Sequence, residues 1–173
     1  MKALYLDNGA TSFPKAPGVG KAMAEYVERV GCNVGRGGYA PAYSAAARLL
    51  EIRGALSRLV GGPGPRNLIF TPGATWGLNM LLKGLLRPGD RVVTSPMEHN
   101  AVLRPLRQLE QAGVEVACFP CDGRGRLLME EVPGLLSPGT RAVVLTHASN
   151  VSGGVMPVEQ VGRLCRERGI FFL

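Results

Sequence analysis

Residues 67–85 read NLIFTPGATWGLNMLLKGL, in which a short apolar run is followed directly by a helix pattern. Residues 67–70 predict a strand, and apolar residues at helical spacing predict the helix that follows: Leu78, Leu81, Leu82 and Leu85. The turn between them aims free backbone N–H groups, the positive end of the helix and the Thr75 hydroxyl at one point. Such a turn suits a phosphate group, although Thr71 and Thr75 could equally cap a helix at which nothing binds.

A second strand pattern, at residues 91–94, leads into a polar turn and another helix pattern. His99 lies in that turn, and therefore at the carboxyl end of a strand, where open α/β sheets bind ligands. An imidazole at such a place can lie flat on a heteroaromatic ring or move a proton near neutral pH. The alternative is a histidine that only caps or packs against the helix.

The same architecture occurs a third time, because the apolar residues 141–146 end in His147-Ala148-Ser149-Asn150. The Asn150 side chain could donate a hydrogen bond to a phenolic oxygen, with His147 and Ser149 in support. The alternative is an asparagine in a turn before two glycines. Unrelated turns have no reason to present ligands for an anion, a ring and an oxygen in sequence order, so the repetition favours one shared site.

Strand and helix patterns alternate along the rest of the chain. Helices are expected near residues 16–30, 43–60, 129–136 and 158–168, and further strands near residues 114–119 and 170–173. This alternation is typical of a parallel α/β sheet with flanking helices.

The charge and hydropathy of the chain indicate which kinds of partner to expect. The net charge is +7 with a pI near 9.7. The basic residues are scattered, only Arg163, Arg166 and Arg168 cluster, and aromatic residues are few, so no specific nucleic-acid partner is expected. No apolar run is long enough to cross a bilayer and the amino terminus lacks the plan of a signal peptide, so a cytoplasmic protein without a membrane partner is the expectation.

The four cysteines suggest no metal centre. Cys118 and Cys121 have the spacing of a redox or metal pair, but they follow a strand instead of opening a helix, and no second pair completes a zinc site. One buried strand cysteine and one loop cysteine are expected.

Five segments resemble the cysteine desulfurases of the class V aminotransferase family, and the resemblance covers residues 7–173. They are Leu6-Asp7-Asn8-Gly9-Ala10-Thr11-Ser12-Phe13-Pro14, Asn33-Val34-Gly35-Arg36-Gly37-Gly38-Tyr39, Phe70-Thr71-Pro72-Gly73-Ala74-Thr75, Met97-Glu98-His99-Asn100-Ala101-Val102 and His147-Ala148-Ser149-Asn150-Val151-Ser152-Gly153. The resemblance implies an α/β fold, the incomplete large domain of a fold type I transferase that uses pyridoxal 5'-phosphate (PLP). Residues 1–40 would form an amino-terminal segment and helix, and residues 41–173 part of the PLP-binding domain.

The resemblance also implies roles for individual residues. Ala74 and Thr75 look like phosphate ligands, His99 like the catalytic histidine that stacks on the cofactor ring, and Asn150 like the partner of its phenolic oxygen. Five other positions resemble segments near the substrate, often across the subunit boundary of a homodimer: Asn8, Ala10, Thr11, Arg36 and Tyr39. Trp76 departs from the family, where a glutamate is usual.

Several family features have no counterpart in these residues. The ring-nitrogen aspartate, the Schiff-base lysine and the loop with the catalytic cysteine cannot be placed, and Lys83 is the last of the four lysines. The expectation is therefore a chain that holds PLP non-covalently at best and is inert alone. The parent reaction would convert L-cysteine to L-alanine with sulfur transfer to an enzyme persulfide. Another class V aminotransferase, a selenocysteine lyase, or a non-catalytic interaction module remain alternatives.

One further expectation concerns sheet order. In the family, two later strands separate the strand at residues 68–70 from the other four. If that order is kept, the segment has no neighbour here to satisfy its backbone groups.

Overall fold

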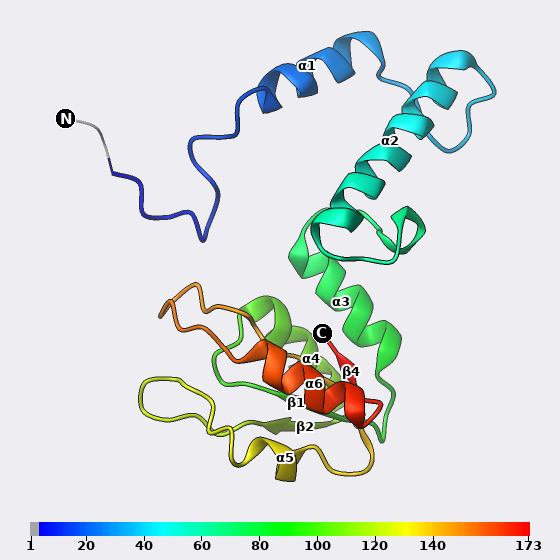
Figure 1. Cartoon of the computed structure of the whole chain (residues 1–173). Helices are drawn as coiled ribbons and strands as arrows, with labels where there is room; N and C mark the ends of the chain where they lie inside the picture. Colours follow the sequence, from blue (N-terminus) through cyan, green and yellow to red (C-terminus); the bar gives the residue numbers. More distant parts are fainter. Residues whose placement is uncertain (1–3) are drawn as a thin grey trace. The chain divides into compact units, whose positions relative to one another are not determined.

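The computed structural model describes residues 4–173, which divide into two compact units (Figure 1). Unit 1 extends to Phe70, and unit 2 comprises Thr71–Leu173. The division differs in position from the boundary at residue 40 that the family resemblance suggested. Each unit is described by itself.

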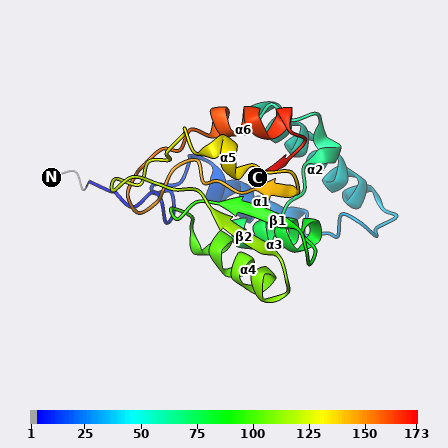
Figure 2. The same ribbon diagram turned by 90° about the horizontal axis from the view of Figure 1, so that it is seen from below.

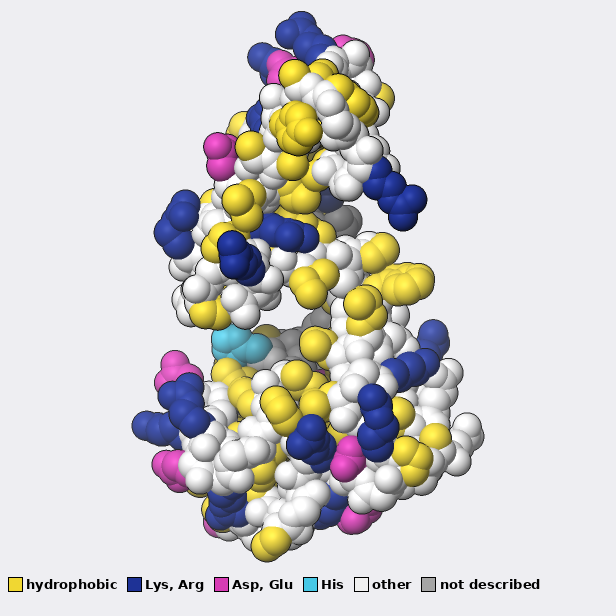
Figure 3. Space-filling view, turned by 90° about the vertical axis from the view of Figure 1, so that its right-hand side faces the viewer, with side chains coloured by type: hydrophobic (Ala, Val, Ile, Leu, Met, Phe, Trp, Pro, Cys, Tyr) yellow, Lys and Arg dark blue, Asp and Glu magenta, His cyan; other side chains and the backbone are white. Residues whose placement is uncertain are grey.

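Unit 1 consists of two helices and a short 3-10 turn. They are α1 (Val19–Arg29), α2 (Ala40–Leu59) and η1 (Pro65–Asn67). Helix α2 begins three residues before the expected start, because Pro41 occupies its first turn, where the fixed φ of proline suits a helix. Helix α1 has no buried residue, and Figure 3 shows many hydrophobic side chains exposed over this unit.

Unit 2 is a parallel α/β layer structure. Its elements are α3 (Ala74–Leu85), β1 (Arg91–Thr94), α4 (Asn100–Gln111), β2 (Glu115–Cys118), α5 (Val132–Leu135), β3 (Thr140–Val143), α6 (Val158–Glu167) and β4 (Phe171–Phe172). All strand pairs are parallel, in the order β2-β1-β3-β4. The predicted α/β fold with a parallel sheet and flanking helices is confirmed.

Helices cover both faces of the sheet, with α3 and α4 on one side and α5 and α6 on the other (Figure 2). Successive strand residues point to opposite faces. Val92 accordingly packs in the cluster beside α3 and α4, Val93 packs in the cluster beside α5 and α6, and both are fully buried. Burial of each such side chain contributes about 1.5–3 kcal/mol, which fixes the sheet between its two helix layers.

The strand predicted at residues 67–70 is wrong. Residue 67 ends the 3-10 turn η1, residues 68–70 belong to no strand, and Ile69 is 71% exposed. A strand forms only when a neighbour accepts and donates its backbone hydrogen bonds. The four-stranded sheet provides none for this segment, in agreement with the sheet-order argument.

The helix expected near residues 129–136 is also shorter than predicted, since α5 spans only Val132–Leu135. Pro133 lies in its first turn and cannot donate a backbone hydrogen bond, and Gly134 follows it, so the segment has little intrinsic helix stability.

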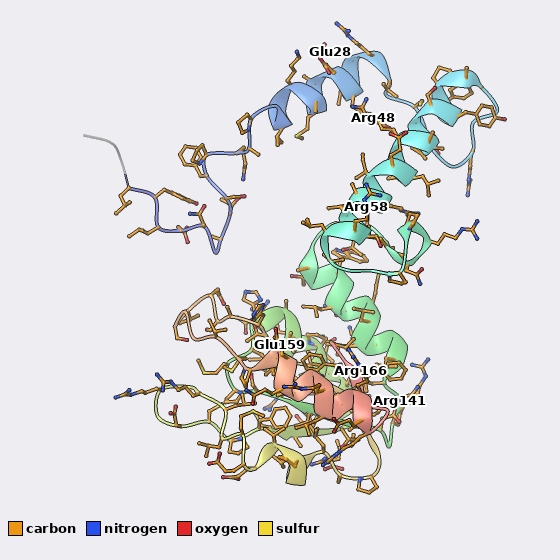
Figure 4. The ribbon with its side chains drawn as sticks, in the orientation of Figure 1. Glu28, Arg48, Arg58, Arg141, Glu159 and Arg166 are labelled. Atoms are coloured by element: carbon orange, nitrogen blue, oxygen red, sulfur yellow. The ribbon has the colours of Figure 1, made fainter. Side chains whose placement is uncertain are left out.

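Basic side chains are spread over separate elements of both units. Figure 4 labels Arg48 and Arg58 on α2, Arg141 on β3 and Arg166 on α6. Arg141 also stacks on the ring of Phe171, with 4.9 Å from the guanidinium carbon to the ring centre. No helix among residues 4–173 has the length and apolar character that a membrane span requires.

Candidate functional site

The carboxyl ends of β1 and β3 meet at one edge of the sheet, because the two strands are parallel neighbours. Beyond the last paired residues, the Val144 N–H still donates to the Val93 carbonyl at 2.9 Å. The connection that contains His99 and the connection that contains Asn150 therefore start from the same edge, as expected for a ligand site of an open α/β sheet.

The turn before α3 is held by its own side chain. Gly73 is the N-cap of the helix and has no side chain to cap it, while the Thr71 hydroxyl donates to the Gly73 carbonyl at 3.0 Å. Ala74 and Thr75 occupy the first turn and are exposed. The first-turn N–H groups and the positive end of the helix dipole thus face solvent beside the Thr75 hydroxyl.

His99 is the N-cap of α4, as the capping alternative predicted. Its Nδ1 atom accepts a hydrogen bond from the Ala101 backbone N–H at 3.0 Å. Because Nδ1 is the acceptor, the neutral imidazole carries its proton on Nε2. The cap fixes the ring and its tautomer while the exposed edge stays available to a ligand.

A pocket of about 260 Å³ lies between the beginnings of α3 and α4. Thr75 and His99 line it together, and Asn150 does not. The complete lining is Thr75, Asn79, His99, Asn100, Ala101, Arg104, Pro105 and Gln108. A guanidinium, a hydroxyl, amides and an imidazole form a donor set that complements an anion attached to a polar ring.

Arg104 was missed by the sequence analysis. It lies three residues after Ala101, whose N–H binds His99, and residues three apart share one face of a helix. That spacing was the available signal, but the sequence alone did not show that this face lines a pocket.

Asn150 occupies a loop that is closed by its own hydrogen bonds. The Ser149 N–H donates to the Gly154 carbonyl at 2.9 Å, and the Gly153 N–H donates to the Ser149 carbonyl at 2.9 Å. The buried Ser149 hydroxyl accepts from the N–H groups of residues 151 and 152. Ser149 therefore supports the loop, and Asn150 is exposed at its turn, where the alternative of an asparagine before two glycines placed it.

Glu98 is the second site feature that the sequence analysis missed. It is only 8% exposed, and its Oε1 atom accepts from the Ser95 hydroxyl and from the Thr146 N–H, each at 2.7 Å. Burial raises the pKa of this carboxyl above its usual range, and the hydrogen bonds from Thr146 and Ser95 oppose that shift.

The five positions compared with substrate-proximal segments all lie in unit 1. Asn8 Oδ1 accepts from the Phe13 N–H at 3.2 Å, and the Thr11 hydroxyl accepts from Lys15 Nζ at 2.7 Å. The Ala10 N–H donates to the Asp7 carbonyl at 3.1 Å. Arg36 and Tyr39 are exposed, and Tyr39 is the N-cap of α2.

Cys118 ends β2, but it is exposed, so the expectation of a buried strand cysteine is wrong. Partial burial raises the pKa of the Cys118 thiol, and the neighbouring Cys121 and Glu98 raise it further. The pKa of Cys121 is raised as well, first by burial and then by Asp122. Thiols with raised pKa values are poor nucleophiles at neutral pH.

A parallel α/β layer in which the starts of α3 and α4 line one pocket defines the class of fold, and the comparisons with known proteins identify its family. A family model described as Aminotransferase class-V matches residues 4–173, so the chain belongs to the class V aminotransferase family. Its curated relatives include cysteine desulfurases, as the sequence motifs predicted. The cysteine desulfurase IscS of Rickettsia bellii is 31% identical over 98% of this chain.

Two solved structures show the same fold. A NifS-like protein superposes with a TM-score of 0.90 at 26% identity, covering 98% of this chain and 47% of its own. SspA in complex with cysteine superposes with a TM-score of 0.86 at 28% identity, covering 97% of this chain and 49% of its own. The match spans 42% of the length of the Rickettsia IscS, so the chain corresponds to less than half of that relative.

Proposed function

We propose that this chain is the cofactor-binding part of a cysteine desulfurase-like enzyme that uses PLP. The observation that carries the proposal is the pocket in which Thr75, at the start of α3, and His99, at the start of α4, lie together beside Arg104. Family membership supports the same cofactor, since cysteine desulfurases and class V aminotransferases depend on PLP. The parent reaction would be conversion of L-cysteine to L-alanine with sulfur transfer to an enzyme persulfide.

Thr75 and His99, which line the pocket together, fit the cofactor, whereas Asn150 lies outside that lining on the loop after β3. Ala74 and Thr75 would hold the phosphate through first-turn N–H groups and the Thr75 hydroxyl. His99 would lie against the ring and hold a proton on Nε2, and Asn150 would donate to the phenolic oxygen. PLP, when bound, supplies an electron sink for the amino-acid substrate. The bound cysteine of the SspA structure supports cysteine as that substrate.

In this proposal, the 173-residue chain does not bind PLP covalently through a lysine. Lys83 is the only lysine of unit 2, and it lies eight residues after Thr75 on α3. At a helical rise of 1.5 Å per residue, it is displaced by about 12 Å along the helix from the phosphate turn. We therefore expect the 173-residue chain to retain PLP only non-covalently and to be inert alone.

The remaining parts of the proposal concern the complete enzyme. Residues 1–40 would form an amino-terminal segment and residues 41–173 part of the PLP-binding domain. Asn8, Ala10, Thr11, Arg36 and Tyr39 would lie near the substrate of a homodimer, and the enzyme would be cytoplasmic.

Cofactor titration tests the proposal. PLP binding is followed by quenching of Trp76, the single tryptophan, which adjoins Thr75. Thr75→Ala should weaken PLP binding by about tenfold, because a hydrogen bond to a charged group is lost. Pyridoxal, which lacks the phosphate, is the matched control ligand and should bind both proteins equally. Equal PLP binding by both proteins, or a band fixed to the chain by borohydride, would count against the proposal.

A further inference from the structure

The connection after β1 is joined to the connection after β3 by one carboxylate oxygen. Glu98 Oε1 accepts the Ser95 hydroxyl and the Thr146 backbone N–H, each at 2.7 Å. Ser95 is fully buried and Glu98 is 8% exposed, so neither partner exchanges readily with water. The contact is therefore internal, although the residue that follows Glu98 is exposed.

This contact connects the two groups assigned to the cofactor ring. His99 follows Glu98 directly, and Asn150 lies four residues after Thr146. Among residues 4–173, no other hydrogen bond joins residues 95–100 to residues 146–156. Beyond the sheet pairing that ends at Val93 and Val144, the Glu98–Thr146 hydrogen bond is thus the direct link between the connection of His99 and the connection of Asn150.

The loop that carries Asn150 is closed by hydrogen bonds between its own residues. The Met156 N–H donates to the His147 carbonyl at 2.9 Å, and Ser149 closes the turn inside that pair. Thr146 lies directly before this closed loop, between it and β3, which ends at Val143. Holding Thr146 therefore orients the whole loop.

We propose that Glu98 is a positioning residue that holds the Asn150 loop at a fixed place relative to His99. The inference rests on the proposed function, because His99 and Asn150 are the groups assigned there to the PLP ring. Glu98 itself does not touch the cofactor in this proposal. A carboxylate is costly to bury unless its hydrogen bonds repay it, so a residue kept only to fill space would be apolar.

Two substitutions of Glu98 distinguish the effect of its side-chain length from the effect of its charge. Glu98→Gln keeps the length and the acceptor oxygen without the charge, whereas Glu98→Asp keeps the charge but is shorter by one methylene, about 1.5 Å. PLP binding by Trp76 quenching is measured where circular dichroism shows each variant folded. Glu98→Gln should bind within about threefold of the unchanged chain, and Glu98→Asp about tenfold more weakly. Equal weakening in both, or none in either, would overturn the proposal, because then reach is not the property that matters.

Hydrogen exchange of backbone amides tests the link without the cofactor. The Thr146 N–H and the amides of residues 147–150 should exchange faster in Glu98→Asp than in Glu98→Gln, while amides of β2 stay unchanged in both. Unchanged exchange in Glu98→Asp would overturn the inference. If the unchanged chain binds no PLP but Glu98→Asp loosens these amides, the proposed function fails and the link between the two connections stands. If either variant does not fold, Ser95→Ala takes its place, since it removes the second donor and should loosen the same amides.

Discussion

Arg91 and Glu115 lie opposite each other at the starts of the neighbouring strands β1 and β2, with 2.7 Å between Arg91 Nε and Glu115 Oε1. The two side chains differ in burial, since 17% of Arg91 and 66% of Glu115 is exposed. Arg91 Nη1 also donates to the Leu135 carbonyl and to the hydroxyls of Ser137 and Thr140. The guanidinium of Arg91 therefore joins β1 to β2, to the end of α5 and to the start of β3. The Glu115 carboxylate takes part in only one of these contacts.

The asymmetry of this pair predicts unequal mutations. Arg91→Ala should lower the free energy of unfolding by about 2–4 kcal/mol, because several partly buried acceptors lose their donor. Glu115→Ala should cost under about 1 kcal/mol, as exposed ion pairs contribute little. Urea denaturation of both variants provides the measurement. Similar losses in the two variants would show that the ion pair, and not the buried hydrogen bonds, stabilises this corner.

Adjacent leucines of α3 provide a matched test of the core beside α4. Leu82 is fully buried and Leu81 is 53% exposed, so the same substitution samples both faces of one helix turn. Leu82→Ala should lower the free energy of unfolding by about 2–5 kcal/mol through lost burial and the cavity left behind. Leu81→Ala should change it by within about 0.5 kcal/mol. Thermal unfolding followed by circular dichroism provides the measurement. Equal melting temperatures of the two variants would contradict this placement of α3.

The parallel sheet was predictable because its elements are encoded locally. Val92 and Val93 lie in a short apolar run, and α4 and α6 show apolar residues at helical spacing, so alternation alone indicated the architecture. The same reasoning placed His99 and Asn150 at one sheet edge, since parallel strands end on the same side. Both conclusions follow from periodicity and strand direction.

Other features were not predictable, because they depend on contacts between distant residues. The segment 68–70 has strand composition, but pairing requires a neighbour that no local pattern reveals. In the sequence Glu98 looks like a polar turn residue. Only the structure shows that the backbone N–H of Thr146, 48 positions away, donates to it. Arg104 could likewise be recognised as a site residue only once the structure showed that it lines the pocket between two helices.

The four cysteines should differ sharply in reactivity. Cys165 is fully buried on α6, and burial raises the pKa of its thiol to about 11. Cys118 is exposed, and Cys32 and Cys121 are partly exposed. A thiol reagent at pH 8 should modify three cysteines of the folded chain and the fourth only after denaturant is added. Rapid modification of all four without denaturant would show that α6 does not stay packed on the sheet.

Glu98 should make the stability of the chain depend on pH. Burial raises the pKa of its carboxyl above the ordinary value of 4.5, so between the two values the folded state binds more protons than the unfolded state. Stability then falls as pH rises through the folded pKa, and it is greatest for this group below about pH 4.5. Glu98→Gln removes the titration, so its stability relative to the unchanged chain should increase from acid to neutral pH. Urea denaturation of both proteins at pH 4 to 7 gives the difference directly, and a difference that stays constant over this range would mean that Glu98 ionises in the folded chain as it does in the unfolded one.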